Sequence, residues 1–288
     1  MLALRKYSDP RQFWTEISPH LKREESKNNL LLGLSHTFLT KPEGCLFQFA
    51  LFTDHELVGA VVGSLFRTNR TLIPAPLKSP EFAKDLFQEI QKSGVEINGI
   101  VGELETAKAY ESLFIEAGRE SRLQMTQGIY RCKKVIPSKN HESLTFRAAQ
   151  MDDVVQVGQW IENFQREAVP HDPAIIGVDL AKTKIENQMI YLIEKESKPV
   201  SMAAWSRDIE TSCSVNLVYT PPDFRKKGYG SLVTAKLTQY LLDSGKSETN
   251  LYTDISNPTS NKIYQNIGYE FVCDSIHIGI SCPEEHKL

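Results

Sequence analysis

The residues of this chain with the clearest chemical potential lie between positions 218 and 230. A strand-like apolar stretch leads there into the turn Arg225-Lys226-Lys227-Gly228-Tyr229-Gly230. A strand, a turn and the start of a helix direct a row of backbone N–H groups toward one point, which favours an anion. Glycines allow close approach of the backbone to such a ligand. The basic side chains add positive charge, so the stretch predicts an anion site suited to a pyrophosphate.

The elements that must position this turn alternate along the second half of the chain. Apolar residues at a spacing near 3.6 predict a helix over 229–243, which Gly245 ends. Pro258 suits the first turn of a helix over 258–267. Alternation and turn residues predict the rest: strands over 144–148, 189–194, 199–207, 212–220 and 250–254, helices over 152–167 and 179–188, and closing strands over 269–274 and 275–280.

The first half of the chain has a similar order of elements. We expect helices over 10–21, 26–35, 81–93 and 106–117, a hairpin over 45–53 and 57–66, and a strand over 99–102. Both halves therefore show helices, a hairpin and then strand–helix alternation, which indicates a diverged duplication. The polar, basic segment 136–143 predicts a linker between one domain at 1–135 and another at 144–288, each of ordinary domain size.

The second half resembles the acetyl-CoA-binding part of a GNAT-type N-acetyltransferase. One block of the resemblance is the strand 215–220 with Pro222 and the R-x-x-G-x-G spacing at 225–230. The other is 257–264, followed by Gly268-Tyr269-Glu270-Phe271. A single R-x-x-G-x-G is weak, whereas two blocks in order at the right separation are specific. In outline the resemblance covers 144–288.

The first half is similar to the degenerate partner domain of tandem GNAT proteins, through residues 27–33 and 54–60. It has no R-x-x-G-x-G, and at the equivalent place it carries Thr71-Leu72-Ile73-Pro74-Ala75-Pro76, whose two prolines supply no N–H donor. The resemblance therefore implies an α/β fold with two tandem GNAT-like domains, each a central mixed β-sheet flanked by helices. It implies no normal cofactor site in the first domain.

The resemblance also assigns cofactor-binding residues in the second domain. Backbone amides of 226–231 would hold the diphosphate of coenzyme A at the helix N-terminus. A backbone N–H near Val218 or Tyr219 would polarise the thioester carbonyl. Asn257 equally fits a plain helix N-cap. The complete set comprises Val218, Tyr219, Thr220, Arg225, Lys226, Lys227, Gly228, Tyr229, Gly230, Ser231, Asn257 and Asn261.

Tyr264 is the candidate catalytic residue. It lies four residues before Gly268, where the resemblance implies a tyrosine that protonates the leaving thiolate as a general acid. The alternative is a half-buried helix tyrosine with a structural role.

The general base stays open, because the strand over 211–220 carries no carboxylate. Asp208, Glu210, Glu167, His171 and Asp172 are candidates, and none is assigned. Proximity supplies much of the rate in such a reaction, with an ordered water carrying the proton.

Composition limits the class of protein. The chain has 288 residues, a formal net charge of −3 and a pI near 6.2, which argues against a nucleic-acid binder. Its five scattered cysteines form no CxxC pair, and its histidines show no metal spacing, so we expect no metal. The start has no signal-peptide pattern, and no long apolar run predicts a membrane span. We expect a cytoplasmic protein.

The sequence therefore leads to two hypotheses. The first is an enzyme that transfers an acetyl group from acetyl-CoA to an amine acceptor by direct attack in a ternary complex. Its acceptor would be an amine-bearing small molecule or a peptide or protein amine, and the enzyme a monomer or homodimer. The second is a non-catalytic acyl-CoA-binding sensor or interaction protein, motivated by the missing strand carboxylate. A nucleotide-binding P-loop is excluded because G-x-x-x-x-G-K-[ST] is absent.

Overall fold

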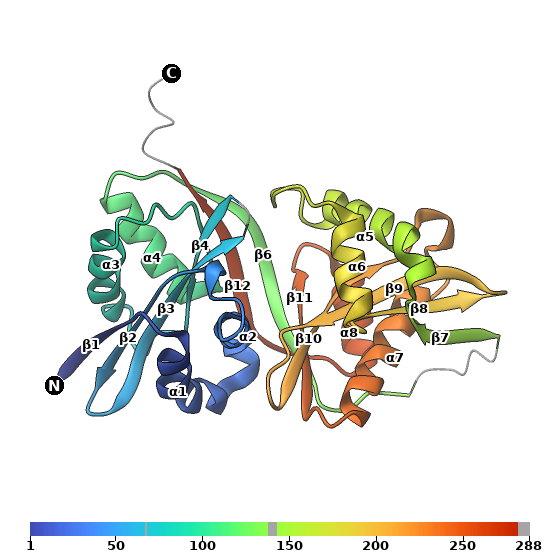
Figure 1. The fold of residues 1–288 in the computed structure, drawn as a ribbon, viewed down its shortest axis with the longest axis horizontal. Coiled ribbons are helices and arrows are strands. Elements are labelled where there is room, and N and C mark those ends of the chain that lie inside the picture. The colour runs from blue at the N-terminus through green and yellow to red at the C-terminus, as the bar shows by residue number, and fades with distance from the viewer. Residues whose placement is uncertain (67, 138–142, 282–288) are drawn as a thin grey trace, which may run out of the picture. The chain divides into compact units, whose positions relative to one another are not determined.

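The computed structural model describes residues 1–66, 68–137 and 143–281. Most of the predicted linker, 138–142, lies outside the described residues. The described chain divides into two compact units. The first consists of Met1–Ile129, Thr253–Ser256 and the described residues from Phe271 onward, and the second of Tyr130–Tyr252 and Asn257–Glu270. Each unit contains strands in a mixed arrangement, with helices on both faces of those strands (Figure 1).

The first unit is built around the strand order β1-β2-β3-β4-β5-β12. Its strands pair antiparallel except β4 and β5, which run parallel. From Met1 to Cys132 the chain forms β1 (Leu2–Tyr7), α1 (Pro10–Leu21), α2 (Glu25–Phe38), β2 (Cys45–Thr53), β3 (Glu56–Phe66), β4 (Asn69–Pro74), α3 (Phe82–Lys92), β5 (Gly99–Glu103), α4 (Leu104–Glu116) and β6 (Ser121–Cys132).

Alternation along β2 shows how the first unit fills both faces of its sheet. Phe47, Phe49 and Leu51 are buried in one core with residues of α3 and α4. Phe52, on the opposite face, meets His20 of α1 edge-on. Because successive strand side chains point to opposite faces, one apolar strand serves a core on each side.

The second unit has the strand order β11-β10-β9-β8-β7. Here β10 and β11 run parallel and the other pairs antiparallel. Its elements are β7 (Leu144–Ala148), α5 (Val154–Ala168), α6 (Gly177–Glu186), β8 (Ile190–Lys195), β9 (Lys198–Ser206), β10 (Ser212–Tyr219), α7 (Tyr229–Asp243), β11 (Glu248–Asp254) and α8 (Pro258–Ile267).

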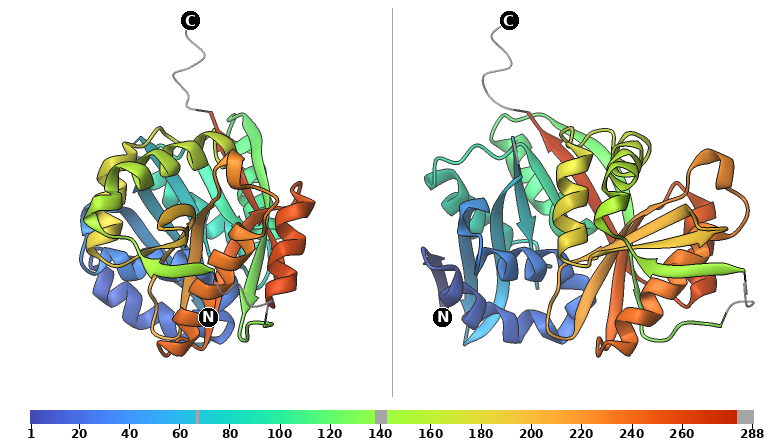
Figure 2. Two further views of the ribbon diagram at one scale, coloured as in Figure 1. Left: turned by 90° about the vertical axis from the view of Figure 1, so that its right-hand side faces the viewer. Right: turned by 45° about the vertical axis from the view of Figure 1, so that its right-hand side comes forward.

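Two helical layers cover the second sheet. α5 and α6 lie on one face and α7 on the other (Figure 2). Trp160 of α5 packs in one core with Leu192 and Met202. Leu237 of α7 packs in the other with Val215. The β10–α7 connection therefore follows the end of a strand whose sheet is packed against helices on both faces.

The last strand differs from expectation. The predicted strands over 269–274 and 275–280 are a single strand, β12 (Glu270–Ile280). It pairs antiparallel with β5 of the first unit, with Ile276 opposite Gly102. Strand β12 therefore pairs within the first unit, whereas the predicted second domain extended to 288. The physical reason is that a strand pattern does not identify the strand partner.

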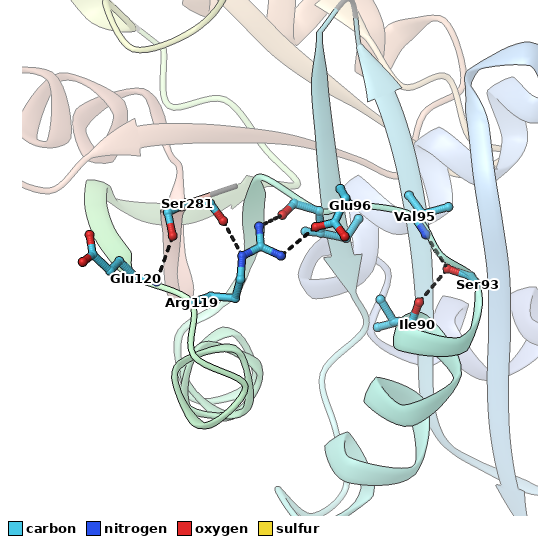
Figure 3. A network of polar contacts seen from close by, with 8 residues as sticks. Ile90, Ser93, Val95, Glu96, Arg119, Glu120 and Ser281 are labelled. Atoms are coloured by element: carbon cyan, nitrogen blue, oxygen red, sulfur yellow. Dashed lines mark hydrogen bonds and ion pairs between the residues drawn. The ribbon is translucent and has the colours of Figure 1, made fainter. Parts of the chain in front are cut away.

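A network around Arg119 fixes the end of β12 within the first unit (Figure 3). The Arg119 guanidinium donates to the carbonyl of Ser281 and, at 2.9 Å, to the Glu96 carboxylate. It donates again to the Ile97 carbonyl at 3.0 Å. The Glu120 amide donates to the Ser281 hydroxyl at 2.9 Å. Charge-assisted bonds of this kind are about twice as strong as neutral ones, so they hold residues 162 positions apart together.

Three strands had no counterpart among the sequence expectations, namely β1, β4 and β6. β1 has only one buried residue, and β4 ends at a proline. The first half of β6 has little burial, so its apolar pattern is weak. Within the described part of the chain, no helix is long and apolar enough to cross a bilayer.

Candidate functional site

Strand β10 is bent by a bulge just before the basic turn. Asn216 lies opposite Ala204 of β9 and Tyr219 opposite Met202, so β10 carries one extra residue there. Leu217 has φ 48°, a left-handed backbone that leucine rarely adopts. On the other side of β10, the paired register with β11 ends at Ser214 and Asn250. The two parallel strands therefore separate where the bulge begins.

The turn after β10 leaves the start of α7 without a cap. Lys226 and Gly228 have φ 60° and 81°, and Gly228 is the N-cap residue of α7. No side chain forms a capping hydrogen bond there. A Cβ placed on Gly228 would meet no atom of the described chain within 4 Å. The first N–H groups of a helix have no intrahelical acceptor, so an uncapped helix start suits an anion.

Basic side chains predominate in the turn that leads into α7. The first turn of α7 carries no acidic side chain. Lys226 and Lys227 are exposed in the turn, and the Lys227 ammonium also donates to the Asp223 carbonyl at 2.9 Å. The positive end of the helix dipole adds to these charges. The start of α7 therefore combines an uncapped helix end with basic side chains, and an anion site there stays a prediction.

The two glycines act differently from the single role expected for them. Gly228 supplies the left-handed backbone of the N-cap. Gly230 allows the first turn of α7 to pack closely against Thr220, because a Cβ there would lie 3.2 Å from the Thr220 hydroxyl oxygen. Thr220 is itself held by a 2.9 Å contact with the Ser201 hydroxyl. The first turn of α7 is thus packed directly against the end of β10.

Arg225 connects the basic turn to the end of β10 and to α5. Its Nε donates to the Thr220 carbonyl at 2.9 Å, and its Nη2 lies 2.6 Å from Oε2 of Glu167 at the end of α5. The Tyr219 hydroxyl donates to Oε1 of Glu167 at 3.5 Å. The guanidinium also lies over the Tyr219 ring, 5.6 Å from its centroid. Arg225 therefore joins α5 to the turn, and Glu167 is occupied as its counter-ion.

The remaining candidate bases differ in their surroundings. Asp208 forms an ion pair of 2.5 Å with Lys246. Burial raises the pKa of Asp172, and the imidazole of His171 lies 3.7 Å away. Glu210 is exposed after β9. None of these contacts selects one of them as a base.

Tyr264 lies half-buried on α8. Its ring meets Tyr269 edge-on at 6.1 Å, and burial raises the pKa of Tyr264 to about 12. In the described part of the chain its hydroxyl makes no hydrogen bond. A phenol keeps its proton at neutral pH and can donate it, although the raised pKa makes Tyr264 a weaker acid than an exposed tyrosine.

The two asparagines of α8 differ. The Oδ1 of Asn257 accepts from the Ser260 amide at 3.1 Å, so Asn257 is the helix N-cap. Asn261 is half-buried one turn later.

Two supports of the site had no sequence signal. Ser201 of β9 donates to the Tyr219 carbonyl at 3.1 Å and holds the end of β10. Leu217 adopts its left-handed backbone within an ordinary-looking apolar run. A bulge depends on how two strands pair, so the residues of one strand do not reveal it.

This chain is similar to a known protein family over part of its sequence and to solved structures in its fold. A family model described as FR47-like protein matches residues 192–277. A search of the curated proteins found no match. A solved Drosophila protein covers 96% of this chain and 98% of its own, at 10% identity and a TM-score of 0.70.

Two further solved structures are similar to this chain over nearly its whole length. A GCN5-related N-acetyltransferase from Sphaerobacter thermophilus is similar over 97% of this chain and 95% of its own, at 12% identity and a TM-score of 0.65. A tandem GNAT protein from the clavulanic acid biosynthesis pathway is similar over 98% of each chain, at 8% identity and a TM-score of 0.59. At these identities the likeness concerns the fold, and it extends over both units. The chain has the tandem GNAT-type fold.

Proposed function

We propose that this protein is an N-acetyltransferase that moves an acetyl group from acetyl-CoA directly to an amine in a ternary complex. The observation that carries the proposal is the uncapped, positively charged start of α7 beside the separated end of β10. The tandem GNAT-type fold supports acyl transfer in general, and two similar structures are described as an N-acetyltransferase and a tandem GNAT protein.

The donor would be held by this chain's backbone. The amides of 226–231 would hydrogen-bond the diphosphate, with Lys226 and Lys227 beside it. The open space in front of Gly228 fits a ligand group that approaches the backbone closely. The edge of β10 beyond Ser214 would receive the extended arm of the donor, and a backbone N–H near Val218 or Tyr219 would stabilise the oxyanion.

The reaction places one demand on each reactant. The neutral amine nitrogen bonds to the thioester carbon, and the carbon–sulfur bond breaks with its electron pair on sulfur. Tyr264 would give its proton to that sulfur. The proton lost by the amine passes to water, since β10 carries no carboxylate and Glu167 is held by Arg225.

A binding experiment tests the donor site. Acetyl-CoA should raise the melting temperature, because it binds the folded state alone. The absence of a shift at millimolar acetyl-CoA would overturn the proposal.

A rate experiment tests the chemistry. Tyr264→Phe should lower kcat in a thiol-release assay with an amine panel by about a hundredfold, at unchanged acetyl-CoA affinity. Tyr240→Phe, which alters an exposed tyrosine of α7, is the matched control. If acetyl-CoA binds and no amine releases thiol, the protein is an acyl-CoA sensor.

A further inference from the structure

A layer of polar side chains lies on the face of β10 and β11 that points away from α7. Thr249 points toward α7, because its hydroxyl lies 2.9 Å from the Tyr269 hydroxyl, which in turn contacts Thr238 of α7 at 2.7 Å. Strand side chains alternate. Asn250 and Tyr252 therefore lie on the opposite face of β11.

Two asparagines of this layer have buried amide atoms without partners. Asn250 is completely buried, and neither its Oδ1 nor its Nδ2 has a hydrogen-bond partner in the described chain. Asn216 donates to the Ser206 hydroxyl at 2.5 Å, while its buried Oδ1 accepts nothing from the described residues. Leaving such an atom unpaired is costly, and a ligand that pairs with these atoms would remove that cost.

The asparagines lie at the point where the strands separate. Asn250 is level with Ser214, in the last pair of the parallel ladder. Asn216 is two residues further along β10, where the bulge begins. An acceptor that reaches the separated end of β10 from this face would meet both amides.

Two cationic side chains lie near strands β9 and β11, which flank β10. The Arg207 guanidinium lies 4.9 Å from the ring centroid of Tyr252, two residues from Asn250 on the same face. Lys184 of α6 reaches in and donates to the Trp205 carbonyl at 3.3 Å. Burial lowers the pKa of Lys184 to about 8, and the charge of Arg207 adds to that effect.

Lys184 forms no ion pair within the described residues. The nearby Asp208 is paired with Lys246. A buried ammonium is costly unless an anion accompanies it. Its single charge matches one carboxylate.

We propose that Lys184, Arg207, Asn216 and Asn250 form the acceptor subsite, and that the acceptor is a small amine bearing a carboxylate. The inference rests on the proposed function, which places the thioester at the separated end of β10. Lys184 takes the carboxylate with Arg207 beside it, and the asparagine amides bind the polar atoms between the carboxylate and the nucleophilic nitrogen.

The test compares acceptors that differ in the carboxylate alone. Glycine, β-alanine and 4-aminobutanoate are assayed by thiol release beside glycinamide, propylamine and butylamine. At least one carboxylated amine should have a kcat/KM tenfold or more above its uncharged counterpart. Calorimetry with that amine and the CoA-saturated protein supplies a readout independent of turnover.

Variants of the subsite separate binding from folding. Lys184→Met should lower kcat/KM for the carboxylated amine at least tenfold more than for its uncharged counterpart, whereas Lys184→Arg retains most of the preference. Asn250→Leu should weaken binding of the carboxylated amine in calorimetry without loss of melting temperature. Lys182→Met, on the exposed side of α6, is the control.

Several results would overturn the inference. Equal use of carboxylated and uncharged amines does so, and so does an equal loss for both classes in Lys184→Met. If acetyl-CoA binds and the carboxylate preference is absent, the acceptor subsite alone is wrong. If acetyl-CoA gives no melting shift, the proposed function fails together with it.

Discussion

The β10–α7 connection of the second unit and the β4–α3 connection of the first occupy equivalent places and use their backbone differently. At the start of α7 no side chain of the described residues caps the first N–H groups, and the space where a Cβ of Gly228 would stand is open. In the first unit, the amides after β4 donate within the protein. Ala75 donates to Ala60 at 2.8 Å, and Lys78 donates to Val58 at 3.2 Å.

The first connection is closed in further ways. The Leu77 amide donates to the Thr106 hydroxyl at 3.1 Å, and Pro76 has no N–H to offer. The first turn of α3 contains Asp85, which would repel an anion. A Cβ on Gly102 of β5 would lie 3.0 Å from Pro74 Cγ, so Pro74 packs against β5 where β10 and β11 have separated.

The comparison teaches that strand–turn–helix order alone does not make a ligand site. A site needs backbone donors that the protein leaves unused, and unused donors contribute nothing to stability. In the first unit the amides of Ala75, Leu77 and Lys78 donate within the protein, whereas under the proposed function the second unit uses such donors for a ligand. That the first unit has no normal cofactor site stays a prediction.

The largest expected effect comes from a substitution in the β10–α7 connection. Gly228→Val should weaken acetyl-CoA binding at least a hundredfold and abolish its melting shift, because φ 81° is strained for valine and the side chain fills the space before the amides. Gly118→Val is the matched control, since Gly118 has the same φ of 81° and equally open surroundings in the first unit. If both variants bind acetyl-CoA normally, α7 is not the donor site.

The next prediction concerns buried charge and its dependence on pH. Lys184 has its pKa lowered to about 8, so between pH 8 and about 10.4 the unfolded chain binds more protons and stability rises with pH. Below pH 8 the full cost of burial remains. Lys184→Met should therefore stabilise the protein by roughly 1–3 kcal/mol at pH 7 and by less at pH 10.

Urea unfolding at both pH values measures this difference. Carboxylate binding should weaken as pH rises through 8, when the ammonium loses its proton. A Lys184→Met variant less stable than the wild type at pH 7 would show that the lysine serves the fold instead of a ligand.

The smallest effect tests the closed connection. Thr106→Ala removes the acceptor of the Leu77 amide and should cost about 1–2 kcal/mol, because that donor is left unpaired. Thr106→Ser keeps a hydroxyl and should recover most of the loss. Calorimetry should give one acetyl-CoA per chain before and after the change. A second bound acetyl-CoA in the alanine variant would mean that the hydrogen bond alone had closed the first unit.

The helices of the chain were largely predictable from sequence. The α1, α7 and α8 bounds agree with the predicted ranges, and α2 is longer than expected by only a few residues. Capping residues, prolines and a 3.6 spacing act within one or two turns, so local sequence suffices. The basic turn was predictable for the same reason, because Gly228 and Gly230 stand at fixed positions near a strand end.

The supports of the candidate site were not predictable. The interaction of Arg225 with Glu167 spans 58 positions. From their local sequence, Arg225 was expected as a charge beside the anion and Glu167 as a candidate base. The burial of Asn250 depends on which residues cover its face of the sheet. A polar residue in a strand gives no local sign that it will be buried without a partner.

The sequence by itself determined the helices, most strands and the basic turn that opens α7, because these depend on neighbours a few residues apart. The tertiary structure alone decided that β12 completes the first unit, that Leu217 bulges, and that Lys184 and Asn250 share one face of the second sheet. Strand pairing and burial join residues far apart in sequence, so they depend on the energy of the whole fold.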